Sequence, residues 1–236
     1  MTTGMVTPID LSRRESIGAL VYFAIYFGYL FVRPESELLH WVSLVFLPLL
    51  LLFIVRKAGK RNIRSVLASV GLRRGNLTKG LLWACIAGLL LSALQLVISR
   101  KADEILEIIL SGRAFYLFPL TFLLMFLTAG FTEEFFFRGV LLTRLEFLFR
   151  SKVLAVLSSS FLFGIYHLPY AYLNPNWPSA GDWSAAWTAA LGQGIPGGLI
   201  LGFIYVYSGR NLLASIVTHS LINALPAMSM IRFGGS

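Results

Sequence analysis

Long apolar runs dominate this chain and restrict the folds that it can adopt. Each run is continuously apolar and not alternating, which disfavours a closed β-barrel. A helix of about 20 such residues is long enough to cross the hydrocarbon core of a bilayer. Seven runs occupy residues 17–32, 38–55, 80–99, 114–149, 153–168, 185–208 and 212–230. The sequence therefore predicts an all-α, polytopic transmembrane helical bundle of about seven spans, or eight if the long fourth run is broken.

The composition argues against the soluble alternatives. Hydrophobic residues make up 57% of the chain and charged residues 13%, with a mean hydropathy of +0.76. A soluble domain carries roughly 25% charged residues. The net charge of +9 would suit nucleic acid only on a water-facing surface, which so apolar a composition can hardly supply. We therefore expect the lipid bilayer as a partner, and no nucleic acid.

The distribution of Lys and Arg predicts an orientation. With the N-terminus inside, fourteen of these residues fall in inner segments and five in outer segments, with Arg138 set aside as intramembrane. The positive-inside rule then favours a cytoplasmic N-terminus. Residues 1–113 would hold three spans and a basic cytoplasmic loop, and residues 114–236 a core of four spans, within a single membrane domain. The basic segment 56–79 is either an interfacial amphipathic stretch or a solvated loop, and residues 169–184 would form an outer, turn-rich loop.

Three charged residues, Glu133, Glu134 and Arg138, lie inside the fourth run. A charged residue near the middle of a span costs about 2.5 to 3.5 kcal/mol, so these groups must pair or have a function. Glu134 and Arg138 lie one turn apart on one helical face and are placed to form a salt bridge, as structural support. Glu133 points about a quarter-turn away and is left over. The alternative is that the run breaks near Gly130 and both glutamates lie at a wet helix end.

Histidines in two later runs extend this polar set. A hairpin of the fourth and fifth spans that turns near residue 150 places Glu133 and His167 at the same depth. The seventh span carries Ser215, His219 and Asn223 at four-residue spacing, which forms a polar stripe on an apolar helix. His219 lies about 13 Å along its helix from Arg210, against about 25 Å for Glu133 from residue 150. His219 is therefore level with Glu133 only if the turn at 208–211 is sunk into the bundle or the fourth helix protrudes.

The sixth span contains Gly194, Gly198 and Gly202 at four-residue spacing, with Pro196 between them. Small residues on one face allow helix backbones to approach closely, so the pattern predicts a packing seam with a kink. A flexible gate is the alternative.

A carboxylate, two imidazoles and an amide in a membrane cavity suit hydrolysis. Glu133 would take a proton from water that one imidazole orients, while the other imidazole and the amide stabilise the oxyanion. The set Glu133, His167 and His219 could instead ligate zinc with one open position. The chain has no His-Glu-x-x-His motif, and its aspartates lie outside the runs. A Ser–His dyad drawn from serines 158–160 stays open, although no nucleophile motif supports it.

Three motifs in this order resemble the signature of the CPBP family of intramembrane endopeptidases, which are CAAX protease and bacteriocin-processing (Abi) proteins. They are Glu133-Glu134-x-x-x-Arg138, Phe163-x-x-x-His167 and His219-x-x-x-Asn223, and the resemblance covers about residues 114 to 225. It implies that Glu133 and His167 activate water, that His219 and Asn223 form the oxyanion site, and that Glu134 and Arg138 give structural support. It favours a glutamate-type mechanism without a cofactor, although zinc remains possible.

The sequence thus predicts an intramembrane endopeptidase that cleaves a membrane-associated peptide or protein, in a prokaryotic plasma membrane. Two other functions use the same polar residues. A non-catalytic scaffold or bacteriocin-immunity protein would use them to hold helices together. A proton-coupled transporter would use Glu133, His167 and His219 as a relay, but such transporters typically contain internal repeats, and none is evident here.

Overall fold

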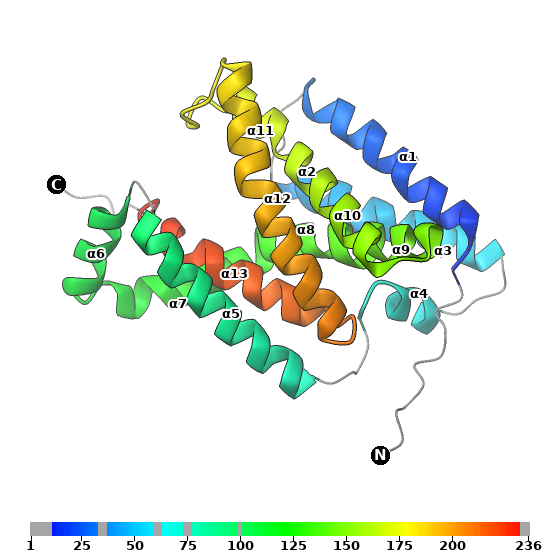
Figure 1. Ribbon diagram of the computed structural model, residues 1–236, viewed down its shortest axis with the longest axis horizontal. Coiled ribbons are helices and arrows are strands. Elements are labelled where there is room, and N and C mark those ends of the chain that lie inside the picture. The colour runs from blue at the N-terminus through cyan, green and yellow to red at the C-terminus, as the bar shows by residue number, and fades with distance from the viewer. Residues whose placement is uncertain (1–10, 33–36, 59–62, 73–76, 99–100, 232–236) are drawn as a thin grey trace.

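The computed structural model describes residues 11–32, 37–58, 63–72, 77–98 and 101–231, and within these ranges every regular element is helical (Figure 1). The α-helices are α1 (Arg13–Leu30), α2 (Glu37–Trp41), α3 (Leu47–Ala58), α4 (Ile63–Ser69), α5 (Leu77–Ile98), α6 (Ala102–Leu110), α7 (Ala114–Met125), α8 (Phe131–Glu134), α9 (Thr143–Phe149), α10 (Lys152–Tyr166), α11 (Leu168–Leu173), α12 (Trp183–Tyr207) and α13 (Leu212–Met228). Three π-helical segments are η1 (Val42–Phe46), η2 (Phe126–Gly130) and η3 (Phe135–Leu142).

The helices confirm a polytopic membrane bundle. Within the described ranges, five are long and apolar enough to cross a membrane: Leu38–Val55, Gly80–Val97, Ala114–Phe149, Lys152–Leu173 and Trp183–Tyr207. The seventh run forms α13, which is apolar but shorter, with 17 residues. The first run forms α1, which begins with Arg13, Arg14 and Glu15. All seven predicted runs are thus helical, and the span count agrees roughly with the prediction.

Polar side chains fix where several helices begin. Ser151 accepts a hydrogen bond from the backbone N–H of Leu154 at the start of α10, and Asp182 and Asn211 cap α12 and α13 in the same way. The residue before Ser151, Arg150, ends α9 in the left-handed region with φ 53°. The α9–α10 hairpin therefore turns where the sequence predicted.

The fifth span continues farther than predicted. The sequence placed its end at residue 168 and a loop from residue 169, whereas the structure adds α11, which reaches Leu173. Pro169 lies in the first turn of α11, where its missing N–H removes no helical hydrogen bond. The chain is turn-rich only after Leu173, up to the cap of α12.

The described part of the basic segment 56–79 includes α4, and α4 belongs to the core. Its Val66 and the following Val70 are buried, and Val70 packs on Gly139 of η3. Gly71 has φ +84°, and a Cβ there would lie 2.8 Å from the Tyr205 hydroxyl, so the position requires glycine. Neither predicted alternative, a solvated loop or an interfacial stretch, describes these buried residues. Residues 59–62 and 73–76 of the segment lie outside the described ranges.

The glycines of α12 form a packing seam against α10. A Cβ on Gly194 would lie 2.5 Å from the Cα of Gly164, and one on Gly198 would lie 2.8 Å from the Cα of Ser160. Such close backbone contact confirms the seam. This contact also fixes the position of α12 along the axis of α10, the helix whose C-cap is His167.

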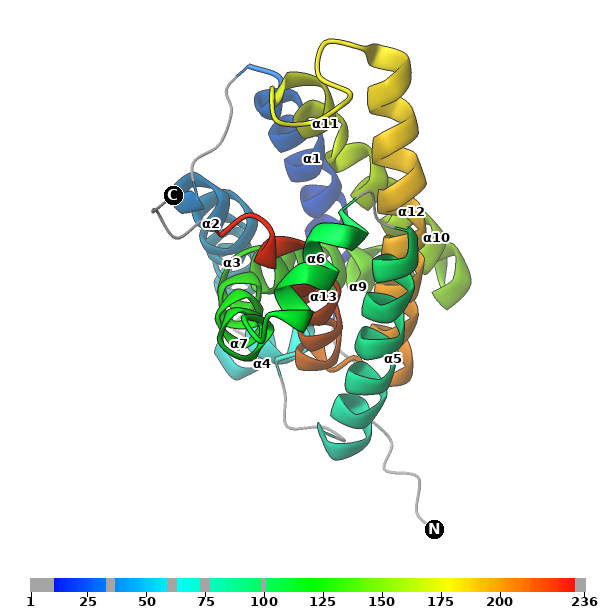
Figure 2. The ribbon, with the colours of Figure 1, turned by 90° about the vertical axis from the view of Figure 1, so that its left-hand side faces the viewer.

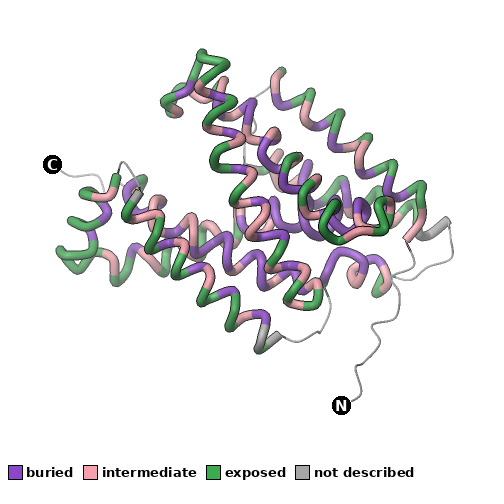
Figure 3. Tube along the Cα trace, in the orientation of Figure 1, coloured by how far each residue is buried: buried purple, intermediate pink, exposed green. Residues whose placement is uncertain are grey.

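Burial is greatest along α8, η3 and α13, as the purple segments in Figure 3 show. The largest cluster of buried apolar residues joins α1, α3 and α4 to η3, α10, α12 and α13, with three consecutive phenylalanines of η3 at its centre. Helix α13 lies between α5 and α7 (Figure 2). The central polar residues are therefore carried by the most enclosed helices of the bundle.

Candidate active site

Glu133 and Glu134 lie on α8, a single turn between two π-helical segments. The backbone of Thr128 departs from helical geometry (φ −102°, ψ −108°), so the run bends just before Gly130. Gly130 lies against Ser220 of α13, where a side chain would collide. The bend does not expose the carboxylates, because Glu133 is 8% and Glu134 0% exposed. The alternative of a wet helix end is therefore wrong.

Glu134 and Arg138 form the buried salt bridge that their spacing predicted, with 2.8 Å between Arg138 Nη1 and Glu134 Oε1. The Arg138 guanidinium also donates to the Gly198 carbonyl of α12 at 3.3 Å and lies 4.4 Å from the centre of the Phe163 ring. These contacts supply hydrogen bonds and a ring face to a cation that is 1% exposed.

Glu134 has a second partner that the sequence did not reveal. His219 Nδ1 lies 2.9 Å from Glu134 Oε1, the same oxygen that Arg138 contacts. A carboxylate can only accept, so the His219 proton lies on Nδ1. Glu134 therefore orients the His219 ring, in addition to pairing with Arg138.

Glu133 faces the two predicted histidines with one of its oxygens. Its Oε2 lies 4.0 Å from His167 Nε2 and 3.9 Å from His219 Nε2. His167 Nδ1 donates to the Phe163 carbonyl at 2.8 Å, which fixes the ring and leaves Nε2 facing the carboxylate. The structure therefore confirms that Glu133 and His167 are level.

His219 is also level with Glu133, despite the mismatch in helix length. The turn before α13 lies beside α9, where Arg210 pairs with Glu146, about one turn before the end of α9. The eight residues of η3 rise less per residue than an α-helix because each π-helical turn holds more residues. The sunken turn and the π-helical segment together bring His219 to the depth of Glu133.

Asn223 occupies the next turn of α13 and is half-buried. Among the described contacts within this cluster, none involves Asn223. The structure thus brings together Glu133, Glu134, Arg138, His167 and His219, and leaves Asn223 one turn away.

The sequence reasoning missed His40, at the end of α2. Its Nε2 lies 4.0 Å from Glu133 Oε1. The chain has three histidines, and all three face Glu133. An ionisable residue inside the second apolar run was the signal that could have marked it.

A family comparison supports these motifs. Residues 115–225 match the family described as type II CAAX prenyl endopeptidase Rce1-like. This part of the chain is therefore similar to that family. The apolar helices show an integral membrane protein, and the match supports a protease of the CAAX type. No curated protein and no solved structure shows significant similarity to it.

The separations around Glu133 can be compared with those of a zinc site. Ligand atoms about 2.1 Å from a tetrahedral ion lie about 3.4 Å from one another. Both imidazole nitrogens lie 3.9 to 4.0 Å from the nearer Glu133 oxygen. Among the described residues, no group of three or more His, Cys, Asp or Glu is arranged to hold a metal ion. The alternative ligand set Glu133, His167 and His219 is thus more open than a zinc site.

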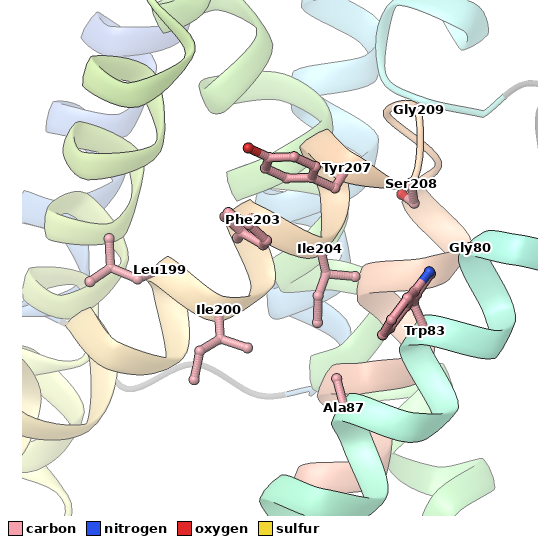
Figure 4. Close-up of a pocket in the computed structure, with 10 residues that line it drawn as sticks. All are labelled: Gly80, Trp83, Ala87, Leu199, Ile200, Phe203, Ile204, Tyr207, Ser208 and Gly209. Atoms are coloured by element: carbon pink, nitrogen blue, oxygen red, sulfur yellow. The ribbon is translucent and has the colours of Figure 1, made fainter.

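A large cavity of about 850 Å³ lies away from this cluster, between α5 and α12 (Figure 4). Its lining is mainly apolar, and Trp83, Phe203 and Tyr207 border it. None of the ionisable residues around Glu133 lines it. This cavity is therefore not part of the candidate active site.

Proposed function

We propose that the protein is a glutamate-type intramembrane endopeptidase in which Glu133 and His167 activate water. The observation that carries the proposal is one buried carboxylate that faces several imidazoles at about 4 Å. A separation of 4.0 Å between Glu133 Oε2 and His167 Nε2 suits one water that hydrogen-bonds to both at about 2.8 Å. Glu133 takes a proton from this water, and His167 orients it for attack on the scissile carbonyl.

His219 and Asn223 are proposed as the oxyanion site. As a donor, His219 must carry a proton on Nε2 as well as on Nδ1. The Nδ1 proton is accepted by Glu134, and this carboxylate compensates the charge on the ring. Glu133 then returns its proton to the leaving amine, which completes hydrolysis without any other co-reactant. Glu134 and Arg138 act as structural support for His219.

The substrate is proposed to be a membrane-associated peptide or protein, and the proposal includes no nucleic acid partner. The matched family is described as acting on prenylated CAAX substrates. A direct comparison of one peptide with and without its prenyl group would show whether this chain requires the lipid. We also propose a cytoplasmic N-terminus in a prokaryotic plasma membrane, and a core at 114–236 that performs the reaction while residues 1–113 complete the bundle.

Glu133→Gln tests the mechanism. This change keeps the size and hydrogen bonding of the side chain but removes the base, so cleavage of a membrane-anchored fluorogenic peptide should be abolished. The purified variant should elute and melt like the wild type. Glu107→Gln is the matched control, because Glu107 pairs with Arg113 on the exposed surface of α6 and should keep full activity. Undiminished cleavage by Glu133→Gln would exclude the mechanism.

The oxyanion assignment and the metal question need separate measurements. Asn223→Ala should lower kcat by about 10² to 10³, as expected for the loss of one oxyanion donor. We propose that no cofactor takes part, so activity should persist in chelator. Elemental analysis that finds one zinc per chain, with activity lost on removal and regained on replacement, would favour a metalloprotease instead.

A further inference from the structure

The two oxygens of Glu133 face different partners. Oε2 faces His167 and His219, which the proposed mechanism uses, whereas Oε1 faces His40 Nε2 at 4.0 Å. The side chain of His40 is 13% exposed and that of Glu133 11%, so this approach takes place inside the protein. The mechanism as stated leaves Oε1 and its neighbour without a role.

His40 is held in this place by aromatic contacts around it. The next residue, Trp41, stacks on Phe131 of α8, with ring centroids 5.2 Å apart and planes inclined by 16°. The Tyr166 hydroxyl lies 3.5 Å from His40 Nδ1, whereas Glu133 faces Nε2 of the same ring. Segment η1, which follows, packs against α8 and η3. Helix α2 is therefore anchored to the short helix that carries Glu133.

A carboxylate that acts as a base must be held with one oxygen toward its water. Rotation about the last side-chain bond would exchange Oε1 and Oε2, since this torsion is broad and roughly two-fold. With Tyr166 beside Nδ1, His40 can direct an Nε2–H toward Oε1 through one water, which suits their separation of 4.0 Å. A donor on this side keeps Oε1 occupied and turns Oε2 toward His167.

We propose that His40 is a positioning residue of the active site, which holds the Glu133 carboxylate by its Oε1. The inference rests on the proposed function. It extends the site to α2, which lies outside the family match at 115–225. The N-terminal helices then contribute to the reaction as well as to the fold.

His40→Phe tests this role, because it keeps an aromatic ring and removes both nitrogens. We expect kcat to fall about 10- to 100-fold, as is usual when an orienting partner is lost, with KM changed by less than about twofold. His40→Gln places an amide N–H near the position of Nε2 and should regain most of the lost kcat. If His40→Phe does not fold, His40→Leu replaces it as the variant without nitrogen.

Trp41→Phe is the matched control. It disturbs the same helix and its packing on Phe131 but leaves the His40 imidazole intact, so its kcat should stay within about threefold of wild type. The inference would be overturned if the nitrogen-free variant kept wild-type kcat, if His40→Gln gave no recovery, or if Trp41→Phe lost as much. Active Glu133→Gln would overturn the proposed function itself. An inactive Glu133→Gln with a fully active His40→Phe would overturn only the role of His40.

Discussion

Two buried arginines on adjoining helical segments, Arg138 of η3 and Arg144 of α9, perform different tasks with similar chemistry. Each is 1% exposed and faces a buried glutamate. Arg138 pairs with Glu134 one turn away, and through Glu134 it reaches the active-site ring of His219. Arg144 lies 3.7 Å from Glu15, which belongs to the distant helix α1.

Further partners of Arg144 on another helix indicate its role. It donates to the backbone carbonyl of Ser69 at 3.0 Å and to the Ser69 hydroxyl at 2.9 Å, both at the end of α4. Its contacts thus join α1 and α4 to α9. A buried ion pair in this bundle can therefore organise either the reaction or the assembly of the N-terminal helices. Burial alone does not distinguish the two.

Removal of Arg138 should have the largest effect. Arg138→Ala strands the Glu134 carboxylate in the protein interior and should lower the free energy of unfolding by about 3 to 5 kcal/mol. Cleavage should also fall below detection, because Glu134 no longer holds the His219 ring in its present orientation. Thermal unfolding in detergent and peptide cleavage by the folded fraction measure the two effects. Wild-type stability would show that the pair is not required.

Arg144→Ala should separate stability from catalysis. The change removes the arginine that faces the buried Glu15 carboxylate. It should lower the free energy of unfolding by a similar amount, about 3 kcal/mol. Among its described contacts none is with Glu133 or Glu134, so cleavage per folded molecule should stay within about threefold of wild type. A loss of catalysis in the folded fraction as severe as that of Arg138→Ala would remove the distinction between the two arginines.

The sequence predicts one of these pairs and not the other for a physical reason. Glu134 and Arg138 are neighbours along one helix, so the helical repeat alone brings them together. Glu15 and Arg144 meet only through tertiary packing of α1 on α9, which no local pattern encodes. The same reason explains His40. Nothing near residue 40 points to Glu133, and the two meet because Trp41 packs on α8.

The positions of the helices likewise fall into those that the sequence predicts and those that it does not. The apolar runs predict the bundle, and the turn at Arg150 and Ser151 predicts that Glu133 and His167 are level. The depth of His219 could not be predicted, because it depends on the sunken turn before α13 and on the smaller rise of π-helical η3, and no local pattern encodes either. The insertion of α4 into the core was missed because its few apolar residues are flanked by many basic ones.

A third pair, between Arg210 and Glu146, gives the smallest expected effect. It tests whether burial determines how much the protein is destabilised when an ion pair is broken. Arg210 Nε donates to Glu146 Oε2 at 3.1 Å, and a second contact joins Nη2 to Oε1, so the geometry is bidentate. The two side chains are 23% and 19% exposed, against at most 1% in the buried pairs, so water solvates either charge when its partner is lost. Glu146→Gln should therefore destabilise the protein by only about 0.2 to 1 kcal/mol, and added salt should reduce the difference from wild type. Unfolding curves of both proteins at low and high salt measure this effect.

A salt-independent loss of stability as large as that of Arg138→Ala would contradict this expectation. It would mean that the pair holds the α12–α13 turn at its depth. Cleavage should then fall as well, because His219 lies on the helix that begins at this turn.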